Sequence, residues 1–89
     1  MRVIGQSRDW ISSDLGDQLM MMNIDRGIYI GLNPMGAQIW RLIETPHATD
    51  DICAELIDRF EVDPATCRAE VDAFIDKMAA RGLVLVTAA

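Results

Sequence analysis

The sequence predicts an α+β domain in which a small three-stranded antiparallel sheet is followed by three helices. Two observations carry this prediction. In the first third of the chain, strand-like runs are separated by turn residues, and one of them alternates apolar and other residues with a strand period. From Asn33 onward, apolar residues recur at helical spacing, and proline or glycine marks the helix ends. The chain has 89 residues, so we expect one domain spanning residues 1–89.

The sheet is expected to contain a β-hairpin preceded by a shorter strand. Two β-compatible runs, residues 18–23 and 27–32, flank the segment Ile24-Asp25-Arg26. Gly27 can take the positive φ that a tight hairpin requires. A short strand around residues 10–12 is the third candidate.

The second run of the hairpin is predicted to be an open edge strand. One of its faces carries Ile28, Ile30 and Leu32, and the other carries Tyr29 and Gly31. Natural proteins usually protect an edge with lysine, proline or a bulge, and residues 27–32 contain neither lysine nor proline. Such an edge is an aggregation risk or a docking strip for another strand, and it also permits a homodimer.

Three helices are expected after the sheet, over residues 34–44, 50–60 and 65–81. Asn33-Pro34 and Asp63-Pro64 each combine an N-cap residue with a proline that fits the first helical position. Thr49 is the expected N-cap of the second helix, and Gly82 is the expected C-terminal stop of the third. The apolar segment 83–86 then packs on the core or pairs as a strand.

Composition and charge exclude several function classes. No apolar run approaches the roughly 18 residues of a membrane helix, and the N-terminus lacks a secretory signal, so a cytoplasmic location is expected. The formal charge of -6 repels nucleic acids and anionic membranes, and a neutral or basic partner is easier to accommodate. Cys53 and Cys67 lie in helical apolar stripes and are expected to be buried thiols.

The sequence offers no recognisable catalytic, metal or cofactor constellation. The single histidine, His47, lies in a short polar loop beside Pro46 and is best explained as solvated. Zinc-ligand spacing, a phosphate-binding loop and a dinucleotide fingerprint are all missing from the sequence. We therefore predict a binding protein that is not an enzyme and uses no cofactor or metal.

A winged-helix DNA-binding regulator is the alternative that a hairpin and three helices allow. The third helix would then contact the DNA, but its charges cancel: Arg68, Lys77 and Arg81 stand against Glu70, Asp72 and Asp76. Lysine and arginine supply most of the affinity for a phosphate backbone. The charge balance therefore disfavours nucleic acid as a partner.

The segment DRGIYIGLNPMGAQIW, residues 25–40, is similar to PqqD-like recognition elements for ribosomally synthesised and post-translationally modified peptides (RiPPs). The similarity continues through the helix pattern to Phe60, Val62-Asp63 and Gly82-Leu83-Val84, and covers about residues 14–86. The chain most resembles the stand-alone leader-binding proteins of lasso-peptide biosynthesis. The short motif is fairly specific, whereas the helical remainder is only a hydrophobic pattern.

This resemblance implies a winged-helix-like fold and a non-catalytic adaptor function. It implies binding of the leader region of a precursor peptide and its delivery to a separate modifying enzyme or leader peptidase. In such proteins the leader adds as a strand to the third strand of the sheet and lies in a groove against the third helix. Here those elements correspond to residues 27–32 and 65–81.

The candidate peptide contacts lie on these two elements. On the strand they are Gly27, Ile28, Tyr29, Ile30, Gly31 and Leu32, and on the helix they are Arg68, Val71, Asp72, Ile75, Asp76, Met78 and Ala79. Core packing competes as the explanation for the aliphatic candidates, and a solvated helix face competes for the charged ones. Tyr29 is the strongest candidate because it points away from the aliphatic face.

Overall fold

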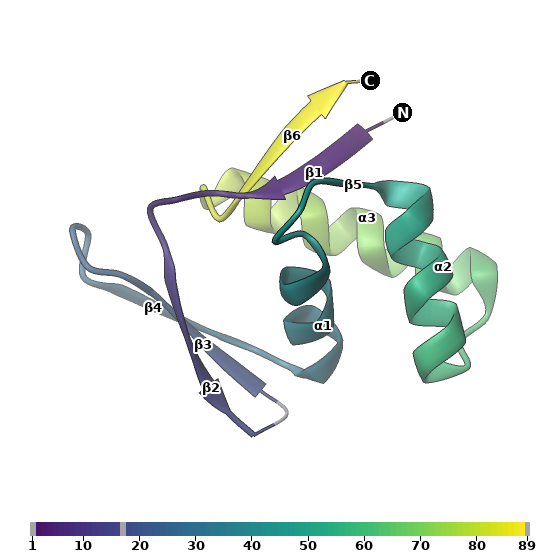
Figure 1. The fold of residues 1–89 in the computed structure, drawn as a ribbon, viewed down its shortest axis with the longest axis horizontal. Coiled ribbons are helices and arrows are strands. Elements are labelled where there is room, and N and C mark those ends of the chain that lie inside the picture. The colour runs from purple at the N-terminus through teal and green to yellow at the C-terminus, as the bar shows by residue number, and fades with distance from the viewer. Residues whose placement is uncertain (1, 17, 89) are drawn as a thin grey trace.

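The computed structural model describes residues 2–16 and 18–88, which form six strands and three helices (Figure 1). The strands are β1 (Arg2–Gln6), β2 (Ile11–Leu15), β3 (Gln18–Asn23), β4 (Ile28–Leu32), β5 (His47–Ala48) and β6 (Val84–Ala88). The helices are α1 (Pro34–Leu42), α2 (Thr49–Phe60) and α3 (Pro64–Ala80). The predicted α+β class is confirmed, while the likeness to a winged helix is loose because the described strands form two separate sheets.

The predicted sheet is present as β2-β3-β4, with both neighbouring pairs antiparallel. Its hairpin closes through a turn in which the Gly27 amide donates to the Ile24 carbonyl at 3.3 Å. Gly27 has a φ of 66°, as expected, but it belongs to the turn and the strand begins at Ile28. The buried Asn23 side chain accepts a hydrogen bond from the Arg26 amide at 3.0 Å and steadies the same turn.

A second sheet, β5-β1-β6, brings the two ends of the chain side by side (Figure 1). The candidate strand at 83–86 is confirmed as β6, which pairs with β1 in the register Ile4↔Val86. Strand β1 and the two-residue strand β5 were not predicted from the sequence. Their pairing joins segments far apart in the chain, so no turn motif in the local sequence indicates it.

Two of the three predicted helix caps are confirmed. The Asn33 side chain accepts from the Gly36 amide at 2.8 Å, and the Asp63 side chain accepts from the Thr66 amide at 3.1 Å. The prediction for Thr49 was wrong, because the N-cap of α2 is Ala48. Thr49 is buried, and its hydroxyl donates to the Arg2 carbonyl at 3.4 Å, so it joins α2 to β1 instead.

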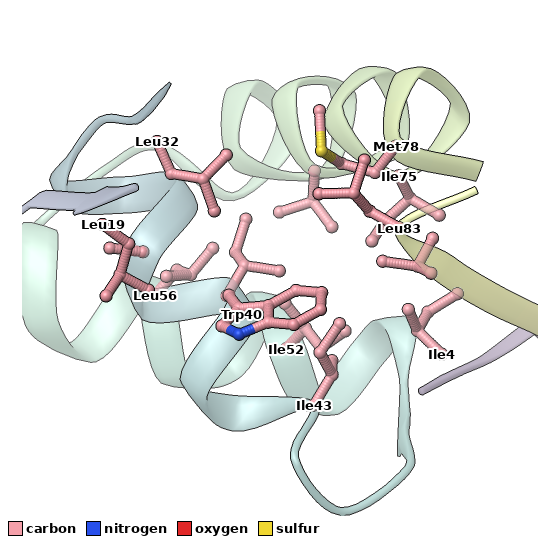
Figure 2. Close-up of a cluster of buried hydrophobic side chains, with 14 of the residues drawn as sticks. Ile4, Leu19, Leu32, Trp40, Ile43, Ile52, Leu56, Ile75, Met78 and Leu83 are labelled. Carbon is pink, nitrogen blue, oxygen red and sulfur yellow. The ribbon is translucent and has the colours of Figure 1, made fainter. Parts of the chain in front are cut away.

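The hydrophobic core lies between the three helices and the inner faces of both sheets (Figure 2). Leu32 reaches it from β4, Ile4 from β1, and Ile75 and Met78 from α3. Trp40 is buried in its middle, and the Gln6 side chain donates to the Trp40 carbonyl at 2.7 Å. The tryptophan thus anchors α1 between the sheets.

The C-terminal end of α3 is closed by two backbone hydrogen bonds. The Gly82 amide donates to the Ala79 carbonyl at 3.1 Å, and the Leu83 amide donates to the Met78 carbonyl at 2.9 Å. This is the Schellman arrangement, in which buried Leu83 also packs next to buried Met78. Gly82 occupies the left-handed position with a φ of 80°, which confirms its prediction as the helix stop.

We expect Gly82→Ala to lower the free energy of unfolding by about 1 kcal/mol, because an L residue is strained at positive φ. The space around Gly82 is open, so the loss reports backbone strain and not a steric clash. Gly31→Ala is the matched control, since Gly31 also has open space and lacks a positive φ. Urea unfolding measures both, and equal stabilities of the two variants would contradict the prediction.

Candidate functional site

Strand β4 forms one edge of its sheet, as predicted. The strand order is β2-β3-β4, and within residues 2–16 and 18–88 no strand pairs with the outer side of β4. The backbone of this edge therefore presents amide and carbonyl groups that can pair with another strand.

The side chains of β4 alternate between the core and the outer face of the sheet. Ile28 and Ile30 are half-buried and pack against the core, and Leu32 is buried. Tyr29 is 69% exposed, and Gly31 is also exposed. Tyr29 lies opposite Met22 of β3, on the face away from the core.

A pocket lies beside the first half of β4, next to the hairpin turn. We call it the hairpin pocket, and its volume is about 190 Å³. Its apolar lining comes from Trp10, Ile28, Ile30 and Ala80, and its charged lining comes from Arg26 and Arg81. The pocket thus joins β4 to the C-terminal end of α3.

A second pocket lies beyond the last residue of β4, where α1 begins. We call it the cap pocket, and its volume is about 350 Å³. It is lined by Asn33, Met35, Gly36, Ile39, Glu70, Ala73 and Phe74. We call the surface that carries these two pockets, one at each end of β4, the β4–α3 groove; the pockets share no lining residue.

Local sequence places the walls of the cap pocket. Asn33 caps α1, so the first helical turn starts directly after β4. A Cβ added at Gly36 would stand 3.0 Å from the Phe74 Cε1 atom, so any other residue would require the Phe74 ring to move away from α1 by a few tenths of an ångström. The cap and the glycine therefore bring α1 and α3 together at this end of the groove.

Helix α3 has three functionally different sides. The buried side carries Cys67, Val71, Ile75 and Met78. The groove side carries the pocket residues Glu70, Ala73, Phe74, Ala80 and Arg81. The far side carries Arg68, Asp72, Asp76 and Ala79. By helical spacing, these residues lie on the flank of the buried stripe that is opposite to the groove side. Asp72 and Asp76 project roughly opposite to Phe74, since successive residues turn by about 100°.

The far side of α3 is joined to other elements by ion pairs. Arg2 of β1 contacts Asp72 at 3.0 Å and Asp76 at 2.8 Å. Arg68 pairs with Asp50 of α2 and, at 3.3 Å, with Asp72. The hydrogen bond to Asp76 is the main cause that raises the pKa of Arg2, and the one to Asp50 raises that of Arg68. These charges connect elements of the fold.

The structure therefore places only part of the predicted contact set at the groove. Ile28 and Ile30 line it, and the rest of β4 lies along it. Val71 and Ile75 are fully buried and Met78 nearly so, which leaves them no free surface because they form the core. The other predicted helix residues, Arg68, Asp72, Asp76 and Ala79, lie on the far side and line neither pocket.

Several groove residues were not predicted from the sequence. They are Trp10, Arg26, Met35, Gly36, Ile39, Glu70, Ala73, Phe74, Ala80 and Arg81. At about 100° per residue, those on α3 all fall on one flank of the helix. The periodicity locates two flanks beside the buried stripe but does not say which of them faces β4.

The two cysteines are buried, and the Cys67 thiol lies 3.9 Å from the Cys53 carbonyl oxygen. Burial is the main cause that raises the pKa of the Cys53 thiol. Among the described residues, no group of three or more His, Cys, Asp and Glu side chains could hold a metal ion. No helix within that part of the chain is long and apolar enough to cross a membrane.

Comparison with known proteins identifies the sequence pattern and the fold. The family model of coenzyme PQQ synthesis protein D (PqqD) matches residues 18–84. The structure is similar to that of TbiB1 in complex with the TbiA(beta) leader peptide, with a TM-score of 0.85 and 24% identity over 96% of this chain and 99% of that chain.

The structure is also similar to lasso peptide synthetase B1 complexed with the leader peptide, with a TM-score of 0.79 and 19% identity. That alignment covers 92% of this chain and 96% of the other. The search of curated proteins gave no match. At these identities, the two solved structures establish the fold.

We expect both thiols to resist alkylation by iodoacetamide in the native protein and to react fully in guanidinium chloride. The thiolate is the reactive form, so the raised pKa of Cys53 lowers its reactive fraction at any given pH, while Cys67 is protected by full burial. Mass spectrometry of quenched samples follows the reaction. Fast alkylation of Cys53 under native conditions would contradict its burial.

Proposed function

This chain belongs to the PqqD family, and we propose that residues 1–89 act as a single domain that binds the leader region of a ribosomally synthesised precursor peptide. The observation that carries the proposal is the open edge of β4 beside a groove with two pockets. The leader adds to β4 as a further strand, and the domain presents it to a separate enzyme. The domain itself is not catalytic.

Backbone pairing along β4 needs support from side chains. Four or five main-chain hydrogen bonds at about 1 kcal/mol each give roughly 4 to 5 kcal/mol, which corresponds to about millimolar affinity. Two buried apolar side chains contribute roughly 1.5 to 3 kcal/mol each before ordering costs. The hairpin pocket and the cap pocket provide places for two such side chains.

Strand geometry limits which peptide residues reach the pockets. Side chains of an added strand alternate between the groove and the outer face of the sheet. Both pockets lie on the groove side, so the sequence positions of two anchors within one regular strand differ by an even number, as in i and i+2. Side chains of the other parity lie on the outer face, beside Tyr29.

The partner enzyme is most simply a leader peptidase of a lasso-peptide pathway, acting in the cytoplasm where the precursor is made. Two solved proteins with this fold are complexes with leader peptides, one of them a lasso peptide synthetase B1. Neither the family nor these structures support the DNA-binding alternative. A second copy of the chain competes with the peptide for the edge of β4. Pairing of two copies through this edge forms a homodimer, which peptide binding would dissociate.

We expect the leader peptide encoded beside the gene to bind saturably with micromolar or tighter affinity, as measured by fluorescence anisotropy. Tyr29→Ala weakens binding, because it removes the exposed ring next to the added strand. N-methylation of peptide amides weakens binding by about tenfold or more at alternate residues only, since alternate amides face β4.

A uniform effect along the N-methylated series would contradict strand addition. Binding of duplex DNA in place of every tested leader would overturn the adaptor proposal and restore the winged-helix alternative.

We expect Ala80→Phe to reduce leader affinity by about tenfold or more, because the new ring occupies the hairpin pocket. Ala79→Phe is the matched control. Ala79 is also exposed and neighbours Ala80, but it lies on the far side of α3 and lines neither pocket. Isothermal titration of both variants, with circular dichroism as a folding check, separates the two sides. A larger loss in Ala79→Phe would place the peptide on the far side.

A further inference from the structure

The positive charges of this acidic protein are distributed unevenly. Of its 8 Lys and Arg residues, Arg2, Arg41, Arg59 and Arg68 form ion pairs. The other four, Arg8, Arg26, Lys77 and Arg81, form none among residues 2–16 and 18–88. Two of these four line the hairpin pocket, and neither wall of that pocket carries an acidic residue.

The backbones of the two arginines of the hairpin pocket belong to a hydrogen-bonded turn and to a helix cap. Arg26 lies in the hairpin turn, where its amide donates to buried Asn23. Arg81 is the C-cap of α3, next to the Gly82 turn. Lys77 precedes Arg81 by four residues, so it follows the same side of the helix. The cations therefore gather at one end of the β4–α3 groove.

The cap pocket has the opposite charge. Its only charged lining residue is Glu70, which forms no ion pair among the described residues. The groove thus runs from a basic end at the hairpin pocket to an acidic end at the cap pocket. The net charge of -6 conceals this local pattern, since several acids lie on α2 and on the far side of α3.

We infer that the β4–α3 groove selects a peptide that carries an aspartate or glutamate beside the apolar side chain bound in the hairpin pocket. This inference rests on the proposed function and specifies the chemistry of the peptide. The guanidinium groups of Arg26 and Arg81 bind the carboxylate, and Lys77 adds a further positive charge along the helix. At the other end, Glu70 disfavours an acidic side chain and favours a neutral or basic one.

The balance between long-range repulsion and short-range attraction makes affinity depend on where the acidic residue lies in the peptide. The protein as a whole repels an acidic peptide, but salt largely screens this repulsion between charges more than about 10 Å apart. An acid placed between the two arginines is much closer than this distance and gains charge-assisted hydrogen bonds. A peptide with an acid at the hairpin end is therefore preferred over the same composition with the acid at the cap end.

A displayed library of random dodecapeptides tests the inference even before the natural leader is identified. We expect the wild-type protein to enrich peptides with two apolar anchors and an acidic residue at constant spacing from one of them. The Arg26→Gln/Arg81→Gln variant keeps the apolar anchors and loses the acidic preference. The matched control, Arg8→Gln/Arg59→Gln, removes the same charge away from the groove and keeps that preference.

The outcomes separate the two proposals. Failure to enrich any peptide on the wild-type protein overturns the proposed function and this inference with it. Enrichment of apolar anchors without a positioned acid, or an acidic preference that survives in the groove variant, overturns this inference alone.

Anisotropy on one enriched peptide completes the test. Replacing its acid by the matching amide lowers affinity for the wild type by about fivefold to tenfold, and lowers affinity for the groove variant by less than about twofold. Equal losses for the two proteins would show that the acid acts elsewhere.

Discussion

Burial of one stripe of α3 in the hydrophobic core is the constraint on which the site depends. Cys67, Val71, Ile75 and Met78 are all buried, and together they set the rotation of the helix about its axis. Once this rotation is set, one flank of α3 must face β4 and the other must face β1 and α2. The Arg2 and Arg68 ion pairs lie on the second flank, and the hairpin pocket and the cap pocket lie on the first.

The groove exists because small residues stand where large ones would close it. Ala73 and Ala80 expose the surface of α3, and Gly36 lets the Phe74 ring approach α1. The β4 edge lies along this space with its amides and carbonyls available. In the proposed complex, backbone pairing would supply affinity that is largely independent of sequence, while the pockets and the charges at their rims would supply selectivity.

Total charge and local charge give different expectations for a ligand. The formal charge of -6 favours a neutral or basic partner at long range. The hairpin pocket presents Arg26 and Arg81 without an acidic neighbour in its lining, so the inferred preference for an acid applies at that place. The difference arises because Coulomb interactions at a few ångströms are screened far less than those across the whole molecule.

Much of the fold could be predicted from the sequence by itself, because hairpin turns, helix caps and side-chain alternation depend on residues close together in the chain. The turn at Gly27, the caps at Asn33 and Asp63, the stop at Gly82 and the exposed Tyr29 were all predicted in this way. Only the tertiary structure could decide the pairing of β1 with β6 and the flank of α3 that lines the groove. Both are set by packing between distant segments, and helical periodicity is the same whichever flank turns toward the sheet.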